Sequence, residues 1–210
     1  MKLLPHLTLA IEAAVSGGSL SLIREGAEIV NWIGISNVAR AEALLADIDL
    51  MFKDRGHNVS DLGLVAVSAG PGSFTGIRIG IATALGLSTG LGIELASESA
   101  LVAMAGSNRG HADLIAAVPA GRESVCFQLF DTSDGVIEKS EPRTEPENAF
   151  RSMIVNSGEK TFILHDDLFK MTNSSSRVIN FGRNIALAIG EVCEVRPRPK
   201  TKPLFISKSQ

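Results

Sequence analysis

The residues of this chain best suited to chemistry lie in a glycine-rich segment, residues 68–92, which holds seven of the 20 glycines. A short apolar run ends there in a Gly-Pro-Gly-Ser loop, and a helix follows the loop. The first N–H groups of a helix lack partners and carry the positive end of its dipole, so such a loop can hold an anion. The candidate residues are Gly70, Gly72, Ser73, Thr75, Gly76 and Arg78. A plain tight turn at these glycines is the alternative.

Other catalytic patterns find little support in the sequence. No Gly-Lys-Ser/Thr follows the loop at the spacing of a nucleotide-binding P-loop, and no G-x-S-x-G elbow is present. Ser73 or Thr75 could act as a nucleophile only with a base that the local sequence does not supply. His165 with two following aspartates could ligate a metal, but a solvated strand end is the simpler interpretation. We therefore predict no metal site and no catalytic residue.

The helix after the loop, expected from about Thr75 to Leu91, carries one charged residue, Arg78. A helix that is apolar all round must be covered on both sides. The small residues Gly76, Gly80, Ala84 and Ser88 share one i, i+4 row, which permits close approach of another helix. The sheet covers one side, and either the helix expected over 37–56 or a partner subunit covers the rest. The residues predicted to face a partner are Leu44, Ile48, Met51, Gly80, Ala84, Leu87 and Ser88.

The order of the expected elements repeats along the chain. Apolar patterns predict strands at 7–11, 19–23, 28–33, 62–68 and 93–97, and helices over 37–56, 75–91 and 99–105. The second part follows with strands at 114–118, 124–131, 136–139, 161–164 and 178–181, and helices over 145–155 and 182–193. This order predicts an α/β protein with a duplicated unit, in two lobes of residues 1–105 and 106–210. The C-terminal helix and basic tail could return to the first lobe.

Composition places the chain among globular proteins. It has 210 residues, 45% hydrophobic and 20% charged, which excludes disorder for most of its length. Two cysteines are too few for a disulfide framework, so a reducing, cytoplasmic location is expected. Glu12 interrupts the apolar run near the start, and no signal peptide is expected. The uncharged stretch 79–93 is too short to span a bilayer, and we predict no membrane segment.

Charge is distributed unevenly. Residues 1–195 hold all 23 acidic residues and 15 of the 20 basic ones, a net charge near -8. Such a body repels nucleic acid. The tail RPRPKTKPLFISKSQ, residues 196–210, is basic and could touch phosphates, although a solvated tail is the simpler interpretation.

The segment SAGPGSFTGIRIGIATALGLSTGLGIELASESALVAMA, residues 68–105, resembles the TsaB (YeaZ) family, non-catalytic paralogues of TsaD in synthesis of tRNA threonylcarbamoyladenosine. The resemblance is specific over 43–105 and collinear elsewhere. It implies the two-lobed fold of actin, Hsp70 and sugar kinases, a duplicated RNase H-like fold. It also implies a heterodimer with TsaD, which modifies adenosine 37 of tRNAs that decode ANN codons, and an ATPase partner, TsaE. ATP and magnesium then belong to partner subunits, no cofactor is bound tightly, and the chain alone is expected to form a homodimer.

The chain departs from the family pattern at several positions. An Asp-Thr-Ser type loop is replaced by Glu12-Ala13-Ala14, and an Asp-Ala-Arg type motif by residues 119–122, Pro-Ala-Gly-Arg. A His near the first helix is replaced by Arg40, and the usual tail Tyr by Leu204 or Phe205. Fewer acidic groups remain to hold a cation on a nucleotide, so independent ATP hydrolysis is less expected. A nucleotide-dependent phosphotransferase or hydrolase that uses loop 70–76, or a glycoprotease-like peptidase, remains the alternative.

Overall fold

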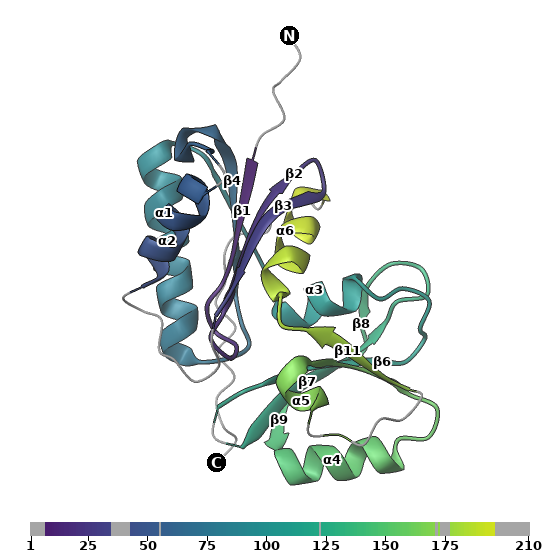
Figure 1. The fold of residues 1–210 in the computed structure, drawn as a ribbon. Helices are drawn as coiled ribbons and strands as arrows, with labels where there is room; N and C mark the ends of the chain where they lie inside the picture. Colours follow the sequence, from purple (N-terminus) through teal and green to yellow (C-terminus); the bar gives the residue numbers. More distant parts are fainter. Residues whose placement is uncertain are drawn as a thin grey trace.

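Two β-sheets with helices on both faces organise the chain in the computed structural model (Figure 1). The structure describes residues 7–34, 43–54, 56–121, 123–170, 172 and 177–195. Expected elements at 37–42, the motif position Arg122 and the basic tail lie outside these residues, as do Arg40, Leu204 and Phe205.

The first sheet joins an antiparallel meander to two parallel strands, in the order β3-β2-β1-β4-β5. β1 pairs antiparallel with β2, and β2 with β3, while β4 and β5 run parallel to β1. β1 and β4 are almost entirely buried, as expected for strands covered on both faces. The strands are β1 (Leu7–Glu12), β2 (Ser19–Arg24), β3 (Ala27–Ile33), β4 (Leu62–Ser68) and β5 (Glu94–Glu98).

The second sheet repeats this arrangement in the order β11-β10-β6-β7-β8, and β9 also pairs with β7. β7 runs antiparallel to β6, while β10 and β11 run parallel to it. In each sheet the central strand, β1 or β6, has an antiparallel meander on one side and two parallel strands on the other. The predicted duplicated α/β fold is therefore confirmed. The strands are β6 (Leu114–Pro119), β7 (Ser124–Asp131), β8 (Ile137–Glu138), β9 (Arg143–Pro146), β10 (Thr161–His165) and β11 (Val178–Gly182).

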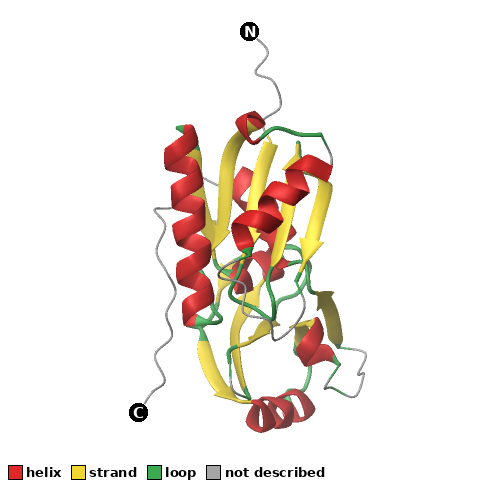
Figure 2. Cartoon of the chain, turned by 60° about the vertical axis from the view of Figure 1, so that its left-hand side comes forward, coloured by secondary structure: helices red, strands yellow, loops and turns green. Residues whose placement is uncertain are grey.

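The helices form layers on and between the sheets. α1 and α2 cover one face of the first sheet (Figure 2), α3 and α6 lie between the two sheets, and α4 and α5 cover the outer face of the second. Each of these three spaces holds its own cluster of buried apolar side chains. The helices are α1 (Leu44–Asp54), α2 (Phe74–Leu91), α3 (Ala100–Gly106), α4 (Glu147–Asn156), α5 (Asp166–Phe169) and α6 (Ile185–Val195), with a 3-10 turn at Val59–Asp61.

The C-terminal helix α6 packs on the first sheet, mainly against β1 and β2. A Cβ atom at Gly190 would overlap the end of the Ile23 side chain and lie 3.0 Å from the Ala10 Cβ atom, so α6 lies close to β1 and β2 at this glycine. Polar bonds hold the start of α6. Arg183 Nη2 donates to the carbonyl oxygens of Ser16 at 2.9 Å and Gly34 at 2.7 Å. The segment that leaves β11 is thereby tied to the first lobe.

The second meander differs from the sequence expectation. Its third strand, expected over 136–139, is only two residues long, and β9 takes over the pairing with β7 at Ser124–Phe127. Pro142 lies between these pieces and has no N–H to donate to a ladder. The short helix α5 was not expected. It begins after His165, whose Nδ1 accepts the Asp167 N–H at 3.2 Å.

Candidate functional site

The glycine-rich loop joins β4 to α2 and bonds mainly within the chain. Ser73 caps α2, since its hydroxyl oxygen accepts the Gly76 N–H at 3.3 Å. The Ser73 N–H donates to the Ala14 carbonyl oxygen at 2.8 Å. Two of the N–H groups that could bind an anion at this helix start are therefore already used.

Two glycines of the loop allow α2 to touch the turn between β1 and β2. A Cβ atom at Gly76 would overlap the Ala13 carbonyl oxygen, and one at Gly72 would lie 2.5 Å from the Ala14 carbonyl oxygen. Gly72 also has a φ of +153°, which side chains rarely adopt. These glycines are thus explained by close packing of backbone on backbone.

Arg78 is not brought to the loop. Its guanidinium carbon lies 3.9 Å from the centre of the Phe74 ring, one turn away on the outer side of α2. Thr75 is exposed on the first turn of the helix. Of the six predicted anion-binding residues, Arg78 therefore lies against its own helix rather than at the loop.

The residues predicted to face a partner lie mostly inside the first lobe. Leu44, Ile48 and Met51 are at most 4% exposed and pack in the cluster beneath α1 and α2. Gly80 and Ala84 are buried too, and a Cβ atom at Gly80 would lie 3.4 Å from that of Ala13. Ser88 is also buried and Leu87 half-buried. The row of small residues thus brings α2 close to the sheet and its turn, rather than to another helix, so arginine at Gly80 or Ala84 would disrupt the fold itself.

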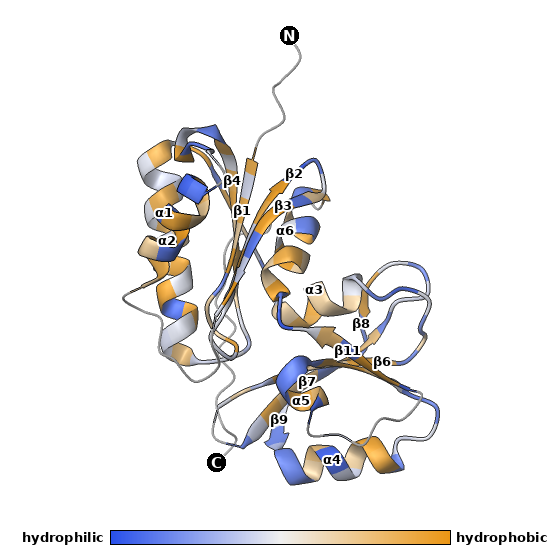
Figure 3. Cartoon of the chain, viewed as in Figure 1, coloured by the Kyte–Doolittle hydropathy of each residue, from blue (hydrophilic) through white to orange (hydrophobic). Residues whose placement is uncertain are grey.

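Other residues of the same helices form the accessible apolar surface. Phe74 and Leu85 on α2 are 50% and 53% exposed, and Leu45 and Leu50 on α1 are 59% and 56% exposed. Orange, hydrophobic segments are visible on both helices in Figure 3. We call Phe74, Arg78, Leu85 and Thr89 the outer stripe of α2, since helical periodicity places them on one side and all four are exposed. Leu85 belongs to the row of Ile77 and Ile81, which drifts from buried to exposed along the helix.

Glu12 ends β1 and is only 2% exposed. Its Oε1 accepts the N–H groups of Ala14 at 2.6 Å and Val15 at 3.0 Å. Burial raises the pKa of this carboxyl to about 7, against the lowering effect of the two hydrogen bonds. Glu12 therefore turns inward to its own loop.

The motif position at the end of β6 is a tight turn. The Ala120 N–H donates to the Ser124 carbonyl oxygen, and the Ser124 N–H donates to the Gly121 carbonyl oxygen at 2.9 Å. Gly121 has a φ of +82°. The described part of this motif, residues 119–121, holds no acidic group.

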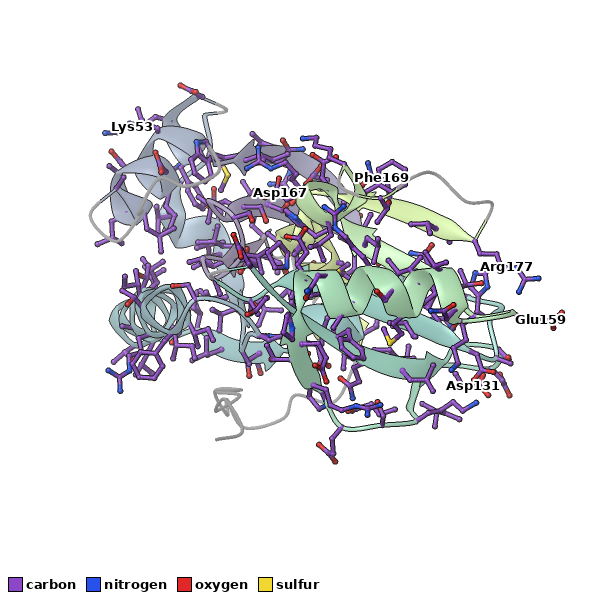
Figure 4. The ribbon with its side chains drawn as sticks, turned by 90° about the horizontal axis from the view of Figure 1, so that it is seen from below. Lys53, Asp131, Glu159, Asp167, Phe169 and Arg177 are labelled. Carbon is purple, nitrogen blue, oxygen red and sulfur yellow. The ribbon has the colours of Figure 1, made fainter. Side chains whose placement is uncertain are left out.

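His165 is buried, 1% exposed, so the interpretation as a solvated strand end was wrong. Burial lowers its pKa to about 4, and the ring stays neutral as a cap for α5. In the view of Figure 4, Asp167 lies well away from Arg177 and Glu159, which are at one edge. Among the described residues, no three His, Cys, Asp or Glu side chains come together as a metal site.

In the described part of the chain, α2 alone is long and apolar enough to cross a membrane, and 22% of it is buried. Length and composition are weak evidence for a span. The packing of Gly80 and Ala84 on the first sheet gives another reason for its apolar character.

Comparisons with known proteins find a matching family model, relatives in sequence and a solved structure of similar fold. A family model described as TsaD, tRNA N6-adenosine threonylcarbamoyltransferase, matches residues 36–145, more than half of the chain. The tRNA threonylcarbamoyladenosine biosynthesis proteins TsaB of Bacillus subtilis and Escherichia coli are each 28% identical, over 135 and 157 residues. These alignments cover 64% and 72% of this chain, and 59% and 68% of the relatives. YeaZ from Pseudomonas aeruginosa, at 18% identity, has a TM-score of 0.65 over 90% of this chain and 92% of its own, which shows a common fold.

Proposed function

Because this chain belongs to the TsaB (YeaZ) branch of the family that the TsaD model describes, we propose that it is a non-catalytic assembly partner of a TsaD homologue in synthesis of threonylcarbamoyladenosine on tRNA. The TsaD homologue performs the transfer. A TsaE homologue joins the pair, and ATP and magnesium belong to these partners. Without them, the chain forms a homodimer in the cytoplasm.

The outer stripe of α2 is the observation that carries this proposal. Phe74 and Leu85 are half-exposed apolar side chains about three turns apart on an 18-residue helix. Exposed aromatic and leucine side chains along one helix are typical of a helix-packing interface. On α1, Leu45 and Leu50 are further exposed apolar side chains.

Charge supports an indirect role toward tRNA. Residues 1–195 carry a net charge near -8, which opposes binding to a phosphate backbone. A chain of this charge is better suited to bind the modifying subunit than to bind tRNA itself. Contact with tRNA is then indirect or made through the basic tail, residues 196–210.

Leu85→Arg tests the interface directly. We expect it to weaken the complex with the TsaD homologue of the same organism by at least about tenfold, because a charge would be buried without a partner. Its melting temperature should stay unchanged, since Leu85 is 53% exposed. Co-expression, pull-down and titration of the purified proteins measure both effects.

Val155→Arg is the matched control for this experiment. Val155 is 83% exposed on α4, on the outer face of the other lobe, and should tolerate arginine without loss of binding. Equal affinity of the Leu85→Arg and wild-type chains would contradict an interface on α2. Loss of the modified nucleoside when the chain is omitted, measured with TsaD, TsaE and ATP present, tests the role in the pathway.

Nucleotide chemistry by the chain itself is the competing function. The N–H groups of Ser73 and Gly76 bond internally, and Arg78 stacks on Phe74. We therefore expect calorimetric titration of the isolated chain with ATP and magnesium to give a Kd weaker than about 1 mM. Tight binding with turnover would favour a phosphotransferase or hydrolase, and cleavage of peptides by the pure chain would favour a peptidase.

A further inference from the structure

The carboxyl group of Glu12 shapes the turn between β1 and β2, residues 13–18, from the inside. Its Oε1 accepts the N–H groups of both Ala14 and Val15, and the side chain is 2% exposed. Water therefore cannot replace these bonds without opening the turn. The N–H groups of Ala14 and Val15 both depend on this one acceptor.

The first turn of α2 rests on the same segment. The Ser73 N–H donates to the Ala14 carbonyl oxygen, and Gly72 and Gly76 bring the helix backbone against Ala13 and Ala14. These contacts join backbone to backbone, so no flexible side chain can absorb a change in the turn. A shift of Ala14 must therefore shift the start of α2.

The far side of the turn is held from other elements. Arg183 Nη2 donates to the Ser16 carbonyl oxygen at 2.9 Å, and the Gly34 N–H donates to that of Gly18 at 3.0 Å. Residues 16–18 are thus also held by bonds from outside the turn. Glu12 holds the N–H groups of the part that contacts α2, and the Val15 carbonyl oxygen of this part also accepts the Gly18 N–H at 2.8 Å.

We propose that Glu12 is a positioning residue, which sets the orientation of α2 and hence of its outer stripe for the partner. This inference rests on the proposed function for its consequence in binding. Its first step, from Glu12 to the start of α2, concerns the isolated chain only. The two steps can be tested separately.

Hydrogen exchange of the isolated chain tests the first step. Glu12→Ala removes the acceptor, whereas the side-chain oxygen of Glu12→Gln can still accept both N–H groups. We expect the Ser73 and Ile77 amides to exchange at least about tenfold faster in Glu12→Ala than in Glu12→Gln. Phe150→Leu, in the buried cluster beneath α4, controls for a general loss of stability and should leave these two amides unaffected relative to the rest of α2.

Affinity for the TsaD homologue tests the second step. Glu12→Ala should raise the Kd by about tenfold at a temperature where it remains folded, and Glu12→Gln should restore the wild-type value. Equal exchange of Ser73 and Ile77 in the two Glu12 variants would overturn the positioning role. If the wild-type chain binds no TsaD homologue, the proposed function fails, while the exchange data still decide whether Glu12 positions α2.

Discussion

Replacing Gly76 by alanine should lower the free energy of unfolding by about 2 to 3 kcal/mol. The added Cβ would overlap the Ala13 carbonyl oxygen and lie 2.9 Å from the Ala14 Cα atom. Both belong to a turn held by Glu12 and Arg183, so they cannot move aside as a side chain would. The helix must separate from the turn or the turn must deform. Urea unfolding of the purified variant measures the loss.

Gly86→Ala provides the matched control in the same helix. Gly86 is exposed and nothing lies within 4 Å of the position of its Cβ atom. Alanine favours helix over glycine, so this variant should gain up to about 1 kcal/mol. Similar effects of the two substitutions would mean that α2 does not rest on the turn as described. A loss of unfolding free energy in Gly76→Ala and a gain in Gly86→Ala would identify the contact with Ala13 as the cause of the loss.

Local patterns in the sequence predict most of the fold because the relevant forces act locally. The apolar run of β4 has the predicted bounds, Leu62–Ser68, and the helix expected over 99–105 is present as α3, capped by Ser99 through the Leu101 N–H. β9 was missed because its four residues, Arg-Thr-Glu-Pro, show no apolar alternation. Its place is set by pairing with β7, a contact between distant residues that no local pattern contains.

The candidate site was less predictable because a periodic stripe does not say what it packs against. The small residues around Gly80 were expected to meet a partner helix, but they meet the sheet and the turn at Ala13. The accessible residue was instead Leu85, in the adjacent row of Ile77 and Ile81. Burial of Glu12 was also missed, although a strand of apolar residues leads directly into it. A charged residue that ends a buried strand can stay buried when backbone N–H groups face it.

Replacing Glu12 by glutamine should also change how stability depends on pH. Burial raises the pKa of Glu12 from 4.5 to about 7, so the folded chain retains a proton that the unfolded chain has released. The free energy of unfolding therefore falls as pH rises between these values, by about 3 kcal/mol in total. Glutamine has no proton to lose and removes this slope, while it keeps the acceptor for Ala14 and Val15.

His165 contributes a slope of the opposite sign. Burial lowers its pKa from 6.5 to about 4, so the unfolded chain takes up a proton first as pH falls. The free energy of unfolding therefore gains a contribution from His165 that rises with pH between about 4 and 6.5. In the wild-type chain the two contributions offset each other between pH 4.5 and 6.5.

Each single variant should expose the slope of the group that remains. Glu12→Gln should gain stability with rising pH up to about 6.5, because His165 then acts alone. His165→Asn keeps a good cap for α5 and should lose stability with rising pH up to about 7, because Glu12 then acts alone. Urea unfolding of the three proteins across this range measures the differences, in which the other titrating groups cancel. Parallel profiles for all three would show that neither group titrates differently in the folded chain.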